Sequence, residues 1–431
     1  MHMVDGAKTA RIGFLLDGDP KTDLMTAAYE FDRSSVRLRV PFRAHTDERG
    51  RWWTGDTVHY ADDPDRTRFA YAPPSEMTYY DNVGPVGLVG CRSGGFSMSF
   101  TTPAGVGTVL ARYAIEGAQF ADHYVRIHGL RSEIDGLAFW FNVSAHTTQM
   151  RHPKAGKPLE ISTTMTTVDD LPLSRRLNLR VVTFGSGPGM WSPEVTYRTR
   201  AHLQTNTATR RDWEEHLELH EAVRNLLRVA SWRPVNFTSH QVISSEGRRP
   251  SASNGLPFPW HEVRTTATGI SDPAWSQQDR FLFNFADIEA TGVRKWITLA
   301  KRYQRGIQPF VGLLDLEGVT IDAALSQLGI AVEAFGYQAL IDSGKSPAAA
   351  DRSKLAQRVE HLIGYAGDSL SFAHTNFGRD FADSYNSVKH ANRPLVTPGL
   401  KLEHFHQGVE LLRVWIALNL GVPAATLESR R

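Results

Sequence analysis

Short runs of alternating apolar and polar residues dominate the chain from residue 10 to about residue 205. An alternation with a period of two places every second side chain on the same face of an extended chain, so it predicts β-strands. Glycine and proline interrupt several runs, as at Gly84-Pro85 and Gly94-Gly95, and such breaks are typical of turns. The pattern predicts an antiparallel sandwich or barrel-like domain, with strands at Val36–Phe42, Phe96–Thr101, Val106–Ile115, His123–Ile127, Leu137–Val143, Leu159–Thr166, Leu177–Phe184 and Val195–His202.

Helical spacing appears first at Arg211–Trp232, where apolar residues recur three or four positions apart. Asn236–Ser244 returns to strand-like alternation and is expected to rejoin the sheet. From Ile288 onward nearly every segment has helical periodicity, and Thr320 is suited to cap one of these helices. The pattern predicts an all-α bundle with helices at Ile288–Arg305, Ile321–Ser343, Ala348–Gly364, Phe372–Asn392 and Leu400–Leu420.

A change of composition separates these two halves of the chain. Serine, glycine, proline and arginine dominate residues 245–272, which we interpret as a loop or linker. We therefore expect an α+β multidomain protein. A β-rich domain would cover residues 1–275 and a helical domain residues 276–431.

Composition narrows the class of protein. Of the 431 residues, 41% are hydrophobic and 22% are charged, as in ordinary globular proteins. The net charge is only +2, so any contact with a nucleic acid must come from a local patch. The single cysteine, Cys91, excludes an intrachain disulfide framework and suits a reducing compartment. No apolar run reaches the length of a membrane span, and Asp17 and Asp19 interrupt the first apolar segment. We expect a cytoplasmic protein without a membrane partner.

The most informative stretch lies late in the helical half. Asn386, Lys389, His390 and Arg393 follow one another at offsets i, i+3, i+4 and i+7, which places them on one broad side of a helix. Asp383 is expected on that side, and Arg379 one turn before it. The opposite side is an apolar stripe formed by Phe377, Phe381, Tyr385 and Val388. A histidine beside cations and an amide suits phosphodiester chemistry, because imidazole moves protons near neutral pH and cations stabilise phosphate charge. The alternative is a side that is simply exposed to solvent.

Two features of the chain resemble a known family. The spacing Asn386-x-x-x-His390 resembles the second half of the R-N-x-x-x-H motif of HEPN domains, small helical modules many of which are RNases. The preceding region resembles the N-terminal domain of ApeA-type antiphage proteins, which carry a C-terminal HEPN module. The family's arginine would stand where this chain has Tyr385, so the motif is degenerate.

The resemblance implies a bacterial antiphage effector acting in abortive infection. Its β-rich domain would sense a trigger, such as a phage protein, and its HEPN-like domain would be an endoribonuclease using metal-independent acid/base catalysis. It implies no cofactor and no metal. RNA, with tRNA as one candidate, would be the substrate. Two HEPN modules would share a cleft in a homodimer or a higher even-numbered oligomer.

The resemblance also implies roles for individual residues. His390 would be the general acid or base, Asn386 would position the phosphate or the histidine, and Lys389 or Arg393 would replace the missing arginine. Glu333, on an earlier helix, would orient His390 or hold a cation near it; its alternative is an exposed carboxylate on an amphipathic helix. The RNA-binding residues would be Lys389, Arg393 and Arg379.

Another class of function remains open. With Tyr385 in the arginine position, the helical domain is alternatively a catalytically degenerate RNA-binding or dimerisation module, with the β-rich domain as a sensor of a ligand or protein. His404 and His406 are two positions apart, which is poor spacing for one metal on a helix, so we expect structural roles for them. A sugar-acting enzyme is disfavoured, since no carboxylate pair can be placed on the β-rich domain.

Overall fold

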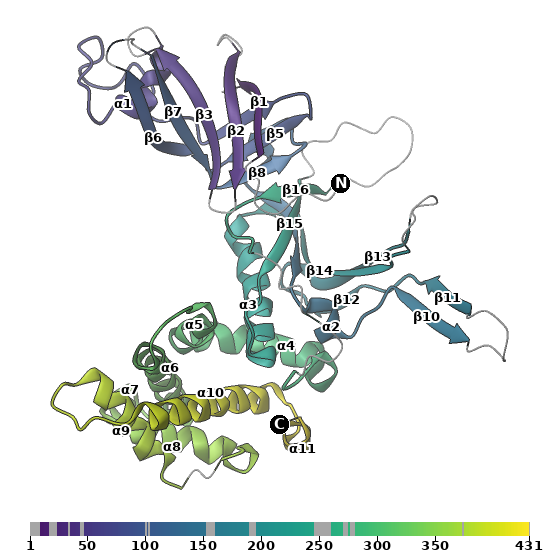
Figure 1. The fold of residues 1–431 in the computed structure, drawn as a ribbon, viewed down its shortest axis with the longest axis vertical. Helices are drawn as coiled ribbons and strands as arrows, with labels where there is room; N and C mark the ends of the chain where they lie inside the picture. Colours follow the sequence, from purple (N-terminus) through teal and green to yellow (C-terminus); the bar gives the residue numbers. More distant parts are fainter. Residues whose placement is uncertain are drawn as a thin grey trace. The chain divides into compact units, whose positions relative to one another are not determined.

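A computed structural model describes residues 9–16, 24–32, 35–43, 47–99, 101, 104–151, 160–188, 195–244, 260–269, 275, 281–372 and 375–430. Most of the predicted linker at 245–272 lies outside the described residues. The chain forms two compact units (Figure 1). The first contains residues 1–134, 203–217 and 236–271, and the second residues 135–202, 218–235 and 272–431. The second compact unit thus contains part of the β-rich region together with the C-terminal helices. The predicted division of the chain into two functional domains near residue 275 stays a prediction.

The first unit is built on an antiparallel sheet. Its strand order is β14-β9-β15-β16-β8-β5-β4-β1-β2-β3-β7-β6, and every pair whose register is described is antiparallel. The strands are β1 (Thr9–Leu16), β2 (Met25–Asp32), β3 (Ser35–Arg43), β4 (Glu76–Tyr80), β5 (Pro85–Val89), β6 (Arg92–Ser99), β7 (Ala104–Ala111), β8 (Tyr113–Glu116), β9 (Ile127–Ile134), β14 (Arg198–Arg211), β15 (Phe237–Ile243) and β16 (His261–Arg264).

Aromatic side chains fill the core of this unit. Helix α1 (Arg51–Thr54) places Trp53 in a stack on Phe42, with ring centroids 5.2 Å apart. A Cβ at Gly107 would lie 2.2 Å from the Trp53 ring, so only glycine fits there. Further along the sheet, Tyr113 stacks on Trp213 at 4.0 Å, where helix α3 (Trp213–Ser231) begins. The alternating strands therefore bury one face, as their sequence pattern predicts.

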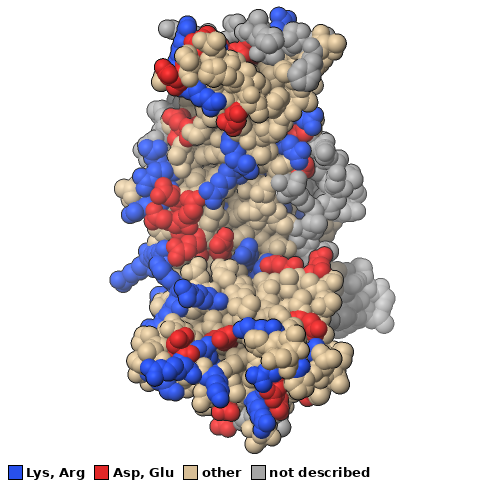
Figure 2. Space-filling model, turned by 90° about the vertical axis from the view of Figure 1, so that its left-hand side faces the viewer, with Lys and Arg blue, Asp and Glu red and all other residues tan. Residues whose placement is uncertain are grey.

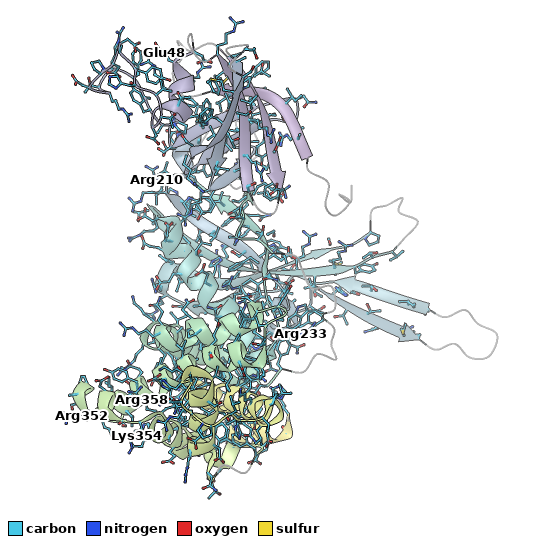
Figure 3. The ribbon with its side chains drawn as sticks, turned by 60° about the vertical axis from the view of Figure 1, so that its left-hand side comes forward. Glu48, Arg210, Arg233, Arg352, Lys354 and Arg358 are labelled. Carbon is cyan, nitrogen blue, oxygen red and sulfur yellow. The ribbon has the colours of Figure 1, made fainter. Side chains whose placement is uncertain are left out.

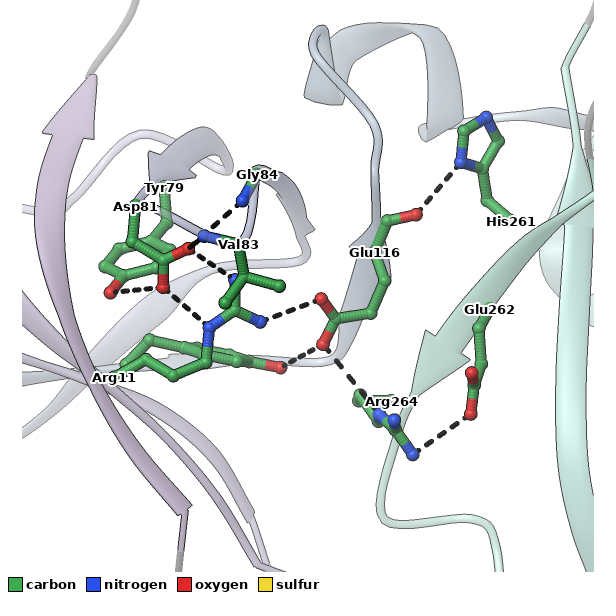
Figure 4. Close-up of polar contacts among 10 residues, drawn as sticks. Arg11, Tyr79, Asp81, Val83, Gly84, Glu116, His261, Glu262 and Arg264 are labelled. Atoms are coloured by element: carbon green, nitrogen blue, oxygen red, sulfur yellow. Dashed lines mark hydrogen bonds and ion pairs between the residues drawn. The ribbon is translucent and has the colours of Figure 1, made fainter. Parts of the chain in front are cut away.

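A polar network ties four strands of this sheet together (Figure 4). Arg11 donates to both carboxylate oxygens of Asp81 at 2.6 and 2.7 Å and to Glu116 at 2.9 Å. The Arg11 guanidinium, opposed by burial and helped by backbone N–H groups, lowers the pKa of Asp81 to about 2. Arg264 approaches Glu116 at 3.8 Å, so β1, β16 and the residues at the ends of β4 and β8 are joined. These groups are engaged with one another, which indicates a structural role.

A buried histidine makes the first unit sensitive to acid. His216 of α3 is 0% exposed, and its Nδ1 lies 2.8 Å from the Thr205 hydroxyl. Burial lowers the pKa of His216 to about 4, because the charged ring would lose its hydration. Between about pH 6.5 and pH 4 the His216 ring is therefore protonated in the unfolded chain but neutral in the folded chain. The free energy of unfolding falls as the pH falls through this window.

We expect this one histidine to lower the free energy of unfolding by about 2 kcal/mol between pH 7 and pH 5. Urea unfolding at both pH values would measure it by comparing wild type with His216→Gln, which removes the titrating ring. His59→Gln, at an exposed position, is the control and should keep the wild-type pH dependence. Equal pH dependence in wild type and His216→Gln would contradict the prediction.

The second unit combines short strands with helices. A separate ribbon pairs β10 with β11, and β12 pairs with β13, followed in the sheet by β14. The elements are β10 (His146–Arg151), β11 (Glu160–Met165), β12 (Leu171–Ser174), β13 (Leu179–Ser186), α2 (Leu137–Phe141), α4 (Phe285–Arg302), α5 (Gln304–Gly312), α6 (Ile321–Asp342), α7 (Pro347–Arg352), α8 (Leu355–Ala366), α9 (Phe377–Lys389), α10 (Pro398–Leu420) and α11 (Ala424–Ser429).

Helices α6 and α10 supply the buried centre of the helical region. Five apolar residues of α6 that recur at helical spacing are all buried: Leu325, Leu328, Val332, Phe335 and Leu340. Val409, Leu412 and Ile416 of α10 are buried too, whereas Phe405 is half-buried. Thr320 caps α6, since its hydroxyl accepts from the Ala323 N–H. The predicted fold class is confirmed: a large antiparallel β-sheet domain is followed in sequence by a helical region.

The predicted strand Val106–Ile115 is two strands, β7 and β8, and two other predicted strands are partly turns. Residues 137–143 contain the helical turn α2, because Leu137, Trp140 and Phe141 are buried at the helical offsets i, i+3 and i+4. Positive φ angles at Gly136 and Asn142 bound this turn. Residues 121–124 form a 3₁₀ turn, and strand β9 begins only at Ile127. At both places the aromatic residues that favoured strands fill a turn instead.

Candidate active site at the end of helix α9

Helix α9 positions the candidate site through its apolar stripe. Phe377, Phe381 and Tyr385 are buried, whereas Val388 is half-buried. The helix ends at Lys389, three residues before the predicted end at Asn392. Pro394 has no N–H and disfavours helical geometry in the residue before it, so the chain leaves the helix a turn earlier.

His390 therefore stands just beyond the helix, in an extended conformation with φ −127° and ψ 115°. Its N–H donates to the Asn386 carbonyl oxygen at 2.9 Å, and the Arg393 N–H donates to the His390 carbonyl oxygen at 3.1 Å. These two backbone bonds hold Asn386, His390 and Arg393 in one compact turn. The expectation that they share the side away from the core agrees with their exposure, although His390 itself is not helical.

The cations of this turn have no acidic partner in the part of the chain that the structure describes. Lys389, His390 and Arg393 are exposed, and Asn386 is half-buried. Among the described residues none of these cations forms an ion pair, and the His390 ring makes no hydrogen bond. The Lys389 ammonium lies 5.4 Å from the centroid of the Tyr385 ring. The arrangement leaves an imidazole and two cations free to meet an anionic ligand.

Arg379, one of the predicted RNA-binding residues, lies about two helical turns before Asn386 on α9. Its guanidinium is 3.9 Å from the Asp383 carboxylate, and both side chains are largely exposed. Exposed pairs of this kind contribute little to stability, so Arg379 remains available to a stronger anion.

Tyr385, which the resemblance to the HEPN motif would align with the motif's arginine, is part of the core. Its side chain is buried against α6, where a Cβ at Gly329 would lie 2.1 Å from the Tyr385 ring. The glycine is needed because the two helices approach so closely. The adjacent Ser384 hydroxyl lies 2.7 Å from Nδ1 of His404 on α10, so the structural role expected for His404 is confirmed.

Glu333 has a different partner from the predicted one. Its carboxylate accepts from the buried Arg358 guanidinium of α8 at 2.9 Å. In the part of the chain that the structure describes, no hydrogen bond or ion pair joins Glu333 to His390. Figure 3 labels Arg358 together with Arg352 and Lys354, which flank the junction of α7 and α8. The role of Glu333 beside His390 stays a prediction. Within one chain, the carboxylate of Glu333 pairs with Arg358.

The carboxylate of Glu333 also lines a cleft that sequence reasoning missed. Two adjoining clefts, of about 760 and 530 Å³, share Lys301 and Arg302 of α4. We call them together the basic groove and define it by the cations that line it: Arg176, Arg294, Lys301, Arg302, Arg305 and Arg358. The recurrence of basic residues at 294, 301, 302 and 305 is the signal in the sequence that could have indicated this groove.

Elsewhere the charges are mixed. On the face drawn in Figure 2, basic and acidic side chains lie among one another, which agrees with the net charge of +2. Among the described residues, no three His, Cys, Asp or Glu side chains are grouped as a metal would need. No helix in the described ranges is both long enough and apolar enough to cross a membrane.

Comparison with known protein families identifies the β-rich part of the chain. The family described as ApeA N-terminal domain 1 matches residues 63–296, more than half of the 431-residue chain. The match ends within α4, so helix α9 lies outside it. No curated protein and no solved structure matches the chain.

Proposed function

The chain belongs to the family of ApeA N-terminal domain 1 and is an ApeA-type antiphage protein, and on this premise we propose that its helical region is an HEPN-like endoribonuclease. The proposal assigns sensing of a trigger, such as a phage protein, to the β-rich residues 1–275. It assigns RNA cleavage to residues 276–431, in the cytoplasm and without a cofactor.

The observation that carries the proposal is the exposed turn at the end of α9. His390, Lys389 and Arg393 are presented there together, and none of them is neutralised by a carboxylate among the described residues. Phosphodiester cleavage needs a proton donor or acceptor and positive charge on the phosphate. This turn supplies both within five residues of sequence.

In the proposed reaction His390 takes the proton from a ribose 2′-hydroxyl or gives one to the leaving oxygen. Lys389 and Arg393 stabilise the charge that builds on the phosphate, and Asn386 donates its amide to the phosphate or to the histidine. Because the turn is exposed, a second copy of the chain would have to exclude water from it. We therefore propose a homodimer, or a higher even-numbered oligomer, that pairs the two turns in one cleft.

One observation favours a second function. Tyr385 is buried against Gly329, so the residue that the resemblance would align with the HEPN arginine is a core residue here. A helical region that lost this cation would keep RNA binding or dimerisation without cleavage. The cations at the end of α9 would then serve binding alone.

Cleavage of total RNA by the full chain, with EDTA present, separates the two functions. The nuclease proposal predicts new RNA ends in EDTA, with product ends typical of attack by the 2′-hydroxyl. RNA binding without cleavage would favour the degenerate module. Absence of both would leave helical residues 276–431 as a dimerisation scaffold, which light scattering would then have to show.

A further inference from the structure

We propose that the basic groove is a binding site for single-stranded RNA, separate from the turn at the end of α9. The inference rests on the proposed function, since it names where the RNA of that function is held. It is carried by the charge balance of the groove, its length and its aromatic lining.

The charge balance comes first. Three of the six cations are neutralised: Arg176 by Glu218, Arg302 by Asp342 and Arg358 by Glu333. The other three, Arg294, Lys301 and Arg305, have no carboxylate partner among the described residues. All three are exposed, so their charges face the groove and the solvent. Such a row attracts an anion.

The length of the row indicates a polyanion. Arg294 and Lys301 are seven residues apart on α4, which is about 10.5 Å along the helix axis. Arg305 continues the row on α5. A single phosphate or a small carboxylate would contact one or two of these cations, whereas a nucleic acid strand would contact all three.

The lining indicates a single strand. Tyr337 of α6 lines the same groove and is half-buried, with the Arg358 guanidinium 5.5 Å from its ring centroid. Proteins that bind single strands combine a basic groove with aromatic side chains on which unpaired bases stack. Bases inside a duplex are not available for such stacking.

The groove has a rigid wall, which would keep its shape without RNA. Arg358 is buried and donates to Glu333 and to the carbonyl oxygens of Ala350 and Asp351. Its Nε is buried without a partner among the described residues. One turn before Glu333 on α6, Gly329 packs against Tyr385 of α9. One helix thus contributes both to the groove and to the support of the candidate active site.

Fluorescence anisotropy with a labelled, unstructured RNA of about 12 nucleotides tests the inference, a length within the site sizes of single-strand binders. All proteins are full-length and carry His390→Ala, so that binding is measured without cleavage. The groove variant is Lys301→Gln with Arg305→Gln. The matched control is Lys345→Gln with Arg352→Gln, two exposed cations of the same unit that do not line the groove.

We expect the affinity of the groove variant for the RNA to be lower by about tenfold or more at 0.1 M salt. The slope of log K against log salt is negative, and its magnitude should decrease by about 1.4 because two cations are removed. The control should stay within about twofold. Circular dichroism should show both variants folded, because all four residues are exposed. Equal binding by the groove and control variants would overturn the inference, as would equal affinity for a duplex of the same length.

The outcome is independent of cleavage. Normal binding by the groove variant, together with cleavage by the otherwise unaltered chain, would refute the groove and leave the nuclease intact. Lost binding in the groove variant without any cleavage by the natural sequence would support the groove and refute the nuclease.

Discussion

If the proposed nuclease is correct, we expect His390→Ala to lower the rate of RNA cleavage by about 10²–10⁴-fold, which is the loss expected when a general acid or base is removed. The ring of His390 is exposed, and its backbone N–H bond to Asn386 is unaffected by the change. Stability should therefore move by no more than about 0.5 kcal/mol. The measurement is the initial rate of cleavage of a defined RNA in EDTA, at several pH values.

Two controls make this result specific. His406→Ala removes another exposed histidine from α10, and its rate should equal that of wild type. Added imidazole should restore part of the activity of His390→Ala, because a free imidazole can carry the proton but cannot replace a merely structural ring. Unchanged cleavage in His390→Ala would exclude this histidine from the chemistry.

Local periodicity predicted α6 well, because the apolar residues that set the period are the ones that become buried. It did not predict the breaks that divide Ile288–Arg305 at Tyr303 and Ala348–Gly364 at Ser353. In α6 the recurring apolar residues are the ones that α10 and its neighbours bury, so its start was predicted and its end missed by one residue. The end of α9 was harder. A helical wheel places His390 on the helix, whereas the structure places it in the turn that Pro394 favours.

Contacts between distant residues could not be predicted in this way. Glu333 pairs with Arg358, 25 positions further on, and nothing local to Glu333 indicates that partner. The basic groove is also formed by residues that are far apart in the sequence. It brings Arg176, in the 3₁₀ turn that follows β12, beside cations of α4 that are more than a hundred residues later. A sequence shows the cations but not the fold that brings them together.

The contacts of Tyr385 in the folded chain likewise determine what a substitution there should do. The sequence alone allows Tyr385→Arg to restore a missing catalytic cation. In the structure, however, the ring is buried and packs on Gly329, so an arginine there must lose its hydration or displace α9. We expect Tyr385→Arg to lower the free energy of unfolding by about 3 kcal/mol, and RNA cleavage not to rise. Urea unfolding and the cleavage assay together would measure this.

Tyr385→Phe is the matched control for that experiment. It keeps the ring against Gly329 and removes only a hydroxyl that makes no hydrogen bond among the described residues. Its stability and its activity should stay close to those of wild type, since no buried partner loses a bond. If Tyr385→Arg were as stable as Tyr385→Phe and cut RNA faster than wild type, the arginine would have reached the surface along its own aliphatic stem. The α9 turn would then be a nuclease site weakened by the loss of one cation, and Lys389 and Arg393 would be insufficient substitutes for it.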